Sequence, residues 1–246
     1  MRYGIISDIH GNLEALQRVL EELEDVDEVI CLGDIVGYGA NPNECCQLVR
    51  ERCSLIIMGN HDAAVIGLMD LRWFNVVAAE ALLWTRSQLS EENINFLSSL
   101  QTLKNVDRLF LTVHGSLRHP IEEYILDERI AYASMLKMPE DINLCFFGHT
   151  HVAEAYLRRL NEKSVSRVEM SKGGKLKLSS DEVYLINCGS VGQPRDGNNM
   201  AGFGIYDVES NEVEVRRVMY DIETTARKIL KAGLPPLLAQ RLFFGR

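Results

Sequence analysis

The sequence predicts an α/β fold in a single domain spanning residues 1–246. The first two-thirds of the chain alternate short apolar runs, typical of β-strands, with amphipathic helical patterns, and this order is characteristic of α/β sheets. From about 153 to 220 the patterns are almost entirely those of β-strands. Of the 246 residues, 46% are hydrophobic and 25% are charged, which is the composition of a globular protein with a substantial core.

Five apolar runs in the first part predict buried strands: Tyr3–Ser7, Glu28–Leu32, Ser54–Met58, Leu109–Val113 and Asn143–Phe147. Between the first two runs, leucines from Leu13 to Leu23 recur on one helical face, which predicts an amphipathic helix. Pro42 is well placed to open a second helix, and we expect this helix to reach about Arg52.

The region 62–104 is too long for a plain strand–helix–strand connection. It is helical in pattern and contains Trp73, Trp84 and many other apolar residues, with Ser90 as a candidate N-cap. We interpret it as a helical, cap-like insert beside the sheet. Two ordinary packing helices are an equally good interpretation, and the role of the insert stays open.

The C-terminal part predicts antiparallel strands followed by a helix. Ala153–Leu160 and Ser164–Met170 have the pattern of a hairpin, and Ser171–Ser180 is polar and glycine-containing, which predicts a loop. Further strands are expected at Val183–Asn187, Gly202–Val208 and Glu212–Tyr220. The last helix is expected from about Asp221 to just before Gly233, with Pro235 and Pro236 beyond its end.

The net charge and the pattern of cysteines limit which partners and which cell compartment we expect for this protein. The formal net charge is −9, which disfavours extended binding to nucleic acids because such binding needs a basic face. A phosphorylated substrate is still compatible, since metal ions supply positive charge locally. No apolar run approaches the ~18 residues of a membrane span, no signal peptide is visible, and none of the six cysteines forms a C-x-x-C pair. These features predict a cytoplasmic protein with reduced thiols and no membrane partner.

Each of the five runs is followed at once by residue types that bind metals. In order, they are Asp8 and His10, then Asp34, then Asn60, His61 and Asp62, then His114, and finally His149 and His151. In open α/β sheets, ligands bind at the carboxyl ends of strands because the loops there converge. We therefore expect these donors to meet at one edge of one sheet, in a metal site with more than one ion.

The residue types agree with that prediction. Imidazole together with carboxylate and amide oxygen suits Mn, Fe, Zn or Co better than Ca or Mg. Asp8 and His10 lie two residues apart, as do His149 and His151, so each pair would point to one side of an extended segment. Sharp turns and close approach to bound ions are expected at the neighbouring glycines, Gly33, Gly59, Gly115 and Gly148.

A single Asp after a strand is usually a cap or turn residue, and a single His there is usually a satisfied polar residue. The joint pattern is different, because five of the six histidines occupy these strand ends and His119 is the exception.

The motifs D-x-H, G-D, G-N-H-D, H-G and G-H-T-H, in this order from Asp8 to His151, resemble the calcineurin-like metallophosphoesterase superfamily. The segments G-D-I-V-G-Y-G and N-C-G-S-V-G-Q-P-R are most similar to its compact prokaryotic phosphoesterases. This resemblance implies a four-layer α/β/β/α sandwich. In it, two mixed β-sheets are flanked by helices, and the metal site lies at the carboxyl ends of the strands.

The resemblance also implies roles for single residues. Two divalent transition-metal ions are expected (Mn, Fe, Zn, Co or Ni, with Mn the first choice in vitro). Two such ions, roughly 3.5–4 Å apart, generate a hydroxide for in-line attack and clamp the phosphoryl oxygens. One ion would be held by Asp8, His10 and His151, the other by Asn60, His114 and His149, with Asp34 bridging them.

The same resemblance assigns catalytic roles to His61 and Asp62. His61 would protonate the leaving oxygen or stabilise phosphoryl charge, and Asn60 would also touch the substrate. Asp62 would orient His61 or cap the following helix, and we favour capping.

Departures from the family pattern bear on the substrate. Serine/threonine protein phosphatases and diadenosine tetraphosphatases typically carry an arginine shortly after this G-D, and this chain has none. Arg195 could bind a phosphate with two parallel hydrogen bonds, or it could be a surface arginine that closes a turn. Arg118 and His119 could reach substrate from the loop after His114, although a plain loop role is simpler.

The sequence therefore favours hydrolysis of small-molecule phosphodiesters or phosphomonoesters, nucleotides included. The alternatives are a serine/threonine protein phosphatase, a diadenosine tetraphosphatase-like hydrolase, and a non-catalytic metal-binding scaffold for partner proteins. The segment Arg241–Arg246 is apolar and basic together. It would dock on the body of the protein or on a second subunit, so a homo-oligomer stays open.

Overall fold

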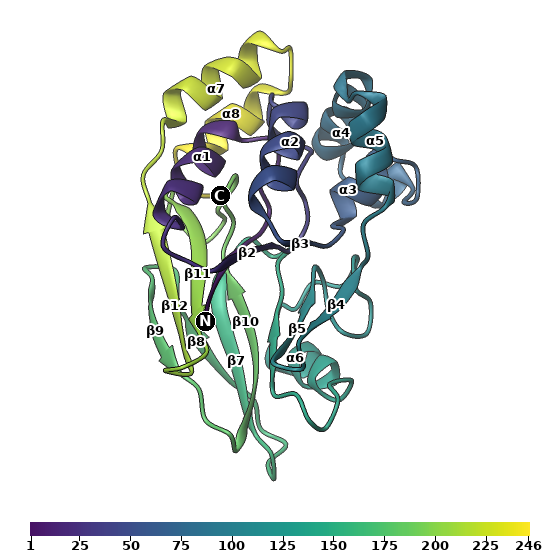
Figure 1. Cartoon of the computed structure of the whole chain (residues 1–246). Helices are drawn as coiled ribbons and strands as arrows, with labels where there is room; N and C mark the ends of the chain where they lie inside the picture. The colour runs from purple at the N-terminus through teal and green to yellow at the C-terminus, as the bar shows by residue number, and fades with distance from the viewer.

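The computed structural model describes all 246 residues, and its strands form two six-stranded sheets (Figure 1). The first has the order β3-β2-β1-β11-β12-β9 and the second the order β4-β5-β6-β10-β7-β8. Both sheets mix parallel and antiparallel pairs. Helices cover the outer faces, which confirms the predicted four-layer α/β/β/α arrangement.

Three regions of apolar core lie between the four layers of the sandwich and join them. The region between the two sheets contains Tyr3, Ile5 and Phe110. A second region joins the first sheet to helices α1 and α2, and a third joins the second sheet to α6. Strand β1 shows how the sequence builds this pattern: Ile5 faces the other sheet and Ile6 faces the helices, because successive side chains in a strand point to opposite faces.

The helices are α1 Leu13–Glu22, α2 Pro42–Arg52, α3 Asn60–Val65, α4 Val76–Gln88, α5 Glu91–Ser98, α6 Glu128–Met135, α7 Ile222–Lys231 and α8 Pro236–Leu242, with a 3₁₀ turn η1 at Leu71–Trp73. Asn12 caps α1 through its side chain, which accepts from Ala15 N (3.1 Å). None of the helices has both the length and the apolar character that crossing a membrane requires.

The strands of the first sheet are β1 Arg2–Ile6, β2 Glu28–Cys31, β3 Leu55–Ile56, β9 Gly174–Lys177, β11 Ala201–Asp207 and β12 Glu212–Val218. Those of the second are β4 Leu103–Val106, β5 Phe110–Val113, β6 Leu144–Phe146, β7 Ala153–Arg159, β8 Ser166–Glu169 and β10 Glu182–Cys188. Within the first sheet β1, β2 and β3 are parallel, and within the second β5, β6 and β10 are parallel.

The expectation that all five runs belong to one sheet was wrong. The first three lie in the first sheet and the last two in the second, because β11 and β10, from the C-terminal part, pair with β1 and β6. Three strand ends from one sheet and two from the other therefore meet at the same end of the sandwich.

Two expectations in the C-terminal part were also wrong. The segment expected to be a loop, 171–180, contains edge strand β9, which pairs with β12. Pro235 and Pro236 do not simply follow the last helix: Pro236 is the first residue of α8, a position where its fixed φ favours helix. The predicted hairpin is confirmed as β7 paired with β8.

Candidate metal centre and adjoining cavity

The backbone is in the left-handed region at five of the seven predicted ligand positions: Asp8, His10, Asp34, His149 and His151 have φ between 51° and 67°. Only three other non-glycine residues in the chain share that conformation, which costs roughly 1–2 kcal/mol per residue. Such strain collects at functional sites. It also corrects the expectation of extended pairs, since tight turns after the strands, and not strand alternation, aim these side chains.

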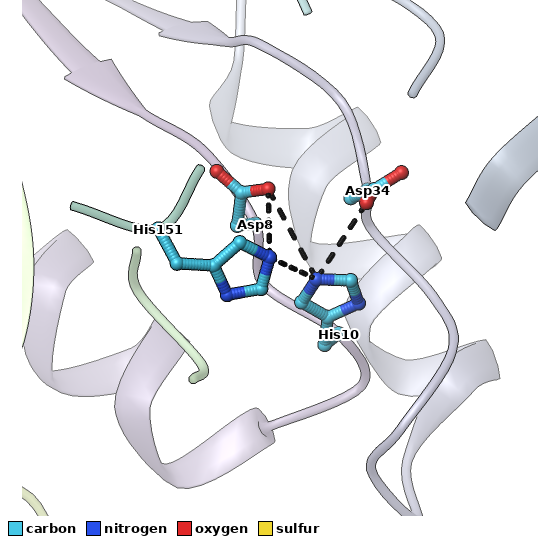
Figure 2. Close-up of side chains that lie close together, drawn as sticks. All are labelled: Asp8, His10, Asp34 and His151. Atoms are coloured by element: carbon cyan, nitrogen blue, oxygen red, sulfur yellow. Dashed lines mark hydrogen bonds and ion pairs between the residues drawn. The ribbon is translucent and has the colours of Figure 1, made fainter. Parts of the chain in front are cut away.

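Four of the side chains form a first group of donors, drawn in Figure 2: Asp8, His10, Asp34 and His151, all buried. Nε2 of His10 lies 3.1 Å from Nε2 of His151 and 3.6 Å from Oδ2 of Asp34. Nε2 of His151 lies 3.3 Å from Oδ1 of Asp8. The donor atoms of the group all lie within 4.8 Å of one another.

A second group consists of Asp34, His114 and His149. Nε2 of His114 is 3.4 Å from Oδ2 of Asp34 and 3.1 Å from Oδ1 of Asn60, so the amide oxygen of Asn60 joins this group. Asp34 belongs to both groups. The structure thus brings together all seven predicted ligand residues, with one carboxylate shared. It also separates His149 from His151, which lie in different groups.

Backbone carbonyls orient the four imidazoles of these groups. Nδ1 of His10, His114 and His151 faces the carbonyl oxygens of Val36 (3.2 Å), Leu32 (2.8 Å) and Gln193 (2.7 Å), in that order. In His149 the other nitrogen, Nε2, faces the carbonyl of Glu122 (3.2 Å). In each ring one nitrogen faces a carbonyl oxygen to which it can donate, which leaves the other nitrogen for the cluster, the arrangement found in metal-binding histidines.

Burial and neighbouring charges shift the pKa values of the cluster side chains in different directions. Burial raises the pKa of Asp8 to about 6, against an opposing effect of His114. Burial alone would lower the pKa of His114, but the Asp34 carboxylate offsets this and raises it to about 9. Burial also lowers the pKa of His149, to about 3. Imidazoles together with buried carboxylates are the donor set that a divalent transition metal prefers.

The backbone at position 59 lies so close to the Asp34 side chain that only a glycine fits there. A Cβ on Gly59 would overlap the Asp34 carboxylate, so no larger residue fits there without displacing the shared ligand. This agrees with the expected role of glycines beside the site.

His61 lies beside the donor groups and not within them. Its ring packs against His10 (centroids 4.6 Å apart), Tyr38 (4.5 Å) and Phe74 (5.1 Å), and Nδ1 has no hydrogen-bond partner. Burial lowers the pKa of His61 to about 4. The ring is therefore neutral in the free protein and is held in place by aromatic contacts.

Of the two roles considered for Asp62, the structure contains the capping contact. Its Oδ2 accepts from Gly59 N (3.0 Å) at the start of α3, and its Oδ1 accepts from Ile35 N (3.0 Å) and Val36 N (3.3 Å). No bond joins Asp62 to the His61 ring. Asp62 therefore acts on the site by holding the loop after β2 against α3.

A cavity of about 340 Å³ adjoins the cluster. It is lined by Asn60, His61, His149 and Arg195, and by the aromatic residues Tyr38, Trp73, Phe74 and Tyr124. A larger cavity, about 520 Å³, lies beside α6 and includes none of the cluster residues. Because residues of the cluster line only the smaller of these two cavities, it is the candidate substrate site.

Arg195 faces that cavity in a defined position. Its Nη2 donates to Oε1 of Gln193 (2.7 Å), and its guanidinium lies 5.6 Å from the centre of the Tyr38 ring. Arg118 instead pairs with Glu123. Neither Arg118 nor His119 lines the cavity.

Sequence reasoning missed the aromatic lining of the cavity. Tyr38 packs against both His10 and His61, and its place in the G-D-I-V-G-Y-G segment was the only signal for it. Tyr124 stacks on His149 with centroids 3.6 Å apart, yet it lies in a loop with no recognisable motif.

Comparison with known proteins agrees with this geometry. The family model described as the calcineurin-like phosphoesterase superfamily domain matches residues 1–211. An uncharacterised protein of Methanocaldococcus jannaschii is 40% identical over 99% of this chain and 98% of its own length.

Two solved structures have the same fold as this chain. The crystal structure of a metallophosphoesterase from Sphaerobacter thermophilus is 43% identical, with a TM-score of 0.89 over 100% of this chain and 99% of that one. A hypothetical protein from Pyrococcus horikoshii shares the fold at 19% identity, with a TM-score of 0.80 over 100% of this chain and 98% of its own. With the family model covering most of its length and relatives matching it end to end, the chain belongs to the calcineurin-like phosphoesterase superfamily.

Proposed function

We propose that this chain is a phosphoesterase that uses two divalent transition-metal ions to hydrolyse small phosphodiesters or phosphomonoesters, nucleotides included. The observation that carries the proposal is the sharing of Asp34 between two groups of metal-binding side chains. A cavity that also exposes Asn60, His61 and Arg195 lies directly beside them, where a phosphoryl group has both metal donors and hydrogen-bond donors within reach.

The two ions are assigned to the two donor groups. Asp8, His10 and His151 would hold one, Asn60, His114 and His149 the other, and the Asp34 carboxylate would serve both. When bound, such ions neutralise phosphoryl oxygens and lower the pKa of water toward neutrality. Mn is the expected metal in vitro, with Fe, Zn, Co and Ni as alternatives that the same donors accept.

His61 is proposed as the acid that protonates the leaving oxygen. Its ring lines the cavity and, with its pKa lowered to about 4 by burial, is neutral before substrate binds. A phosphoryl anion beside it favours the protonated ring, so protonation accompanies substrate binding. Asp62 contributes by fixing the loop and the helix between which His61 sits.

Arg195 is proposed to bind the phosphoryl oxygens. Gln193 holds its guanidinium in the cavity beside Asn60 and His61, where two parallel N–H groups fit two phosphoryl oxygens. It would supply the contact that an arginine after the G-D motif supplies in protein phosphatases. A cavity of about 340 Å³ suits one small ligand, which favours small phosphoesters over phosphoproteins.

A screen of metals and substrates tests the proposal. Protein stripped with a chelator is reloaded with Mn, Co, Ni, Zn or Mg and assayed on bis-p-nitrophenyl phosphate, p-nitrophenyl phosphate and a phosphopeptide panel. We expect hydrolysis of the small esters that disappears on chelation. Faster hydrolysis of phosphopeptides would favour a protein phosphatase, and bound metal without any hydrolysis would favour a scaffold.

A further inference from the structure

Two aromatic rings at the rim of the 340 Å³ cavity are exposed. Trp73 is 78% exposed and Tyr124 is 41% exposed, and both line the cavity together with His61 and His149. They come from segments that follow strands of different sheets: Trp73 from η1, between α3 and α4 in the chain, and Tyr124 from the loop between β5 and α6. Exposed aromatic side chains that line one cavity together form an apolar patch of the kind that marks a ligand-binding groove.

One of the two rings contacts the cluster directly, and the other belongs to the residue next to one that packs on His61. The Tyr124 ring stacks on the His149 ring, with centroids 3.6 Å apart and planes 21° from parallel. Phe74, the neighbour of Trp73, packs edge-on against His61. A flat group placed on these aromatic surfaces would therefore be attached to a phosphoryl group at the metal cluster by a short connection.

The polar groups of the cavity distinguish a heteroaromatic ring from an alkyl chain. Oδ1 of Asn75 is occupied by Ala78 N (3.0 Å), which leaves the amide NH₂ of Asn75 as a donor. Glu122 also lines the cavity, and its side chain is exposed and makes no hydrogen bond or ion pair within the chain, so its carboxylate is a free acceptor. A free carboxylate disfavours a second phosphate here, whereas a ring carrying an amino group and ring nitrogens complements both.

We propose that this cavity binds the nucleobase of a nucleoside phosphoester, stacked on Trp73 and Tyr124, with its phosphoryl group at the metal cluster. The inference rests on the proposed phosphoesterase function and adds the group that the enzyme selects. It also gives the helical insert a role, because η1 carries Trp73. The cavity volume suits a single nucleoside, and base–aromatic stacking is largely independent of base identity.

Binding of ligands that cannot be hydrolysed tests the inference apart from turnover. The phosphonate analogue of adenosine 5′-monophosphate, in which a methylene replaces the bridging ester oxygen, is compared with the phosphonate of ribose 5-phosphate by calorimetry on the Mn-loaded full chain. We expect the nucleoside analogue to bind at least about tenfold more tightly, within the range of about 5- to 150-fold that stacking on one aromatic side chain gives.

Single-residue variants test whether Trp73 and Tyr124 cause the preference for the nucleoside analogue. Trp73→Ala and Tyr124→Ala should each remove most of the preference. Both residues are exposed, so both variants should fold, and circular dichroism checks this. The matched control is Trp84→Phe, which changes the only other tryptophan, a residue that does not line this cavity. It should leave both dissociation constants unchanged. It also makes Trp73 the sole tryptophan, so its fluorescence should be quenched by the nucleoside analogue alone.

The outcomes separate the two proposals. Equal affinity for the two phosphonates, or a preference that survives in both alanine variants, would overturn the nucleobase site even if small phosphoesters are hydrolysed. Selective nucleoside binding without hydrolysis of any phosphoester would leave the site intact and overturn the proposed phosphoesterase function instead.

Discussion

Oδ1 of Asp34 accepts the backbone N–H of His61 over 2.8 Å. The carboxylate shared by the two donor groups therefore also fixes the first turn of α3, from which His61 enters the cavity. In the proposed function, this one side chain would couple metal binding to the placement of His61.

Asp34→Asn is predicted to lower the occupancy of both metal positions together. The amide is nearly isosteric and keeps an oxygen that can accept from His61 N, but it loses the charge that a shared ligand needs. Metal content per chain is measured by plasma mass spectrometry after dialysis against limiting Mn. Asp141→Asn, at an exposed position that belongs to neither donor group, serves as the control. Full occupancy of one position in the Asp34 variant would contradict the sharing.

His61→Ala is predicted to reduce turnover of a phosphoester by about 10²–10⁴, the usual contribution of a positioned acid, while the metal content stays normal. The reason is that His61 lies outside both donor groups. Steady-state kinetics and metal analysis on the same sample check this. If the loss of metal accounts for the whole loss of activity, the acid role is wrong. A substrate with a strongly acidic leaving group should be less affected, because its oxygen needs no proton.

Arg195→Lys is predicted to raise KM for small phosphoesters by about tenfold or more. Lysine keeps the positive charge but loses the planar fork that binds two oxygens at once. Initial rates over a range of substrate concentrations give KM and kcat separately. Arg108→Lys, which alters an exposed arginine paired with Asp141, should leave KM unchanged. An unchanged KM in Arg195→Lys would mean that this arginine only packs on Tyr38.

Native protein is predicted to react with a thiol reagent at no more than one of its six cysteines. Five are buried and only Cys53 is partly exposed, and burial raises the pKa of Cys53 to about 12, so little thiolate is present at pH 8. Reaction with a disulfide reagent is followed by absorbance, with and without guanidinium chloride. All six should react in denaturant, and Cys53→Ser should remove any native reaction. Rapid reaction of two or more thiols in the native state would show that the core is not packed as described.

The fold class and the gathering of the candidate ligands at one place were predictable from the sequence, but the pairing of the strands that carry them was not. Metal-binding residue types immediately after apolar runs are a local signal, and His10 or His149 could be recognised without knowing what each strand pairs with. The assignment of the runs to two sheets depends on contacts between β1 and β11 and between β6 and β10. Such long-range pairings leave no trace in local periodicity.

Short or exposed elements were missed for a related reason. Strand β9 is largely exposed on both faces, so it lacks the alternation of apolar and polar residues that marks a half-buried strand. The left-handed turns at Asp8 and His151 were also not predictable, because tertiary contacts impose them on residues other than glycine. The cavity lining is assembled from the insert and a loop, which no single motif describes.

The central claim is that two ions, sharing Asp34, are both needed for phosphoester hydrolysis. The most direct test titrates chelator-stripped protein with Mn and measures bound metal and hydrolysis of bis-p-nitrophenyl phosphate in the same samples. We predict that activity rises with occupancy of the second position and reaches its plateau at two ions per chain. Full activity at one ion per chain, or no activity at two, would contradict the account.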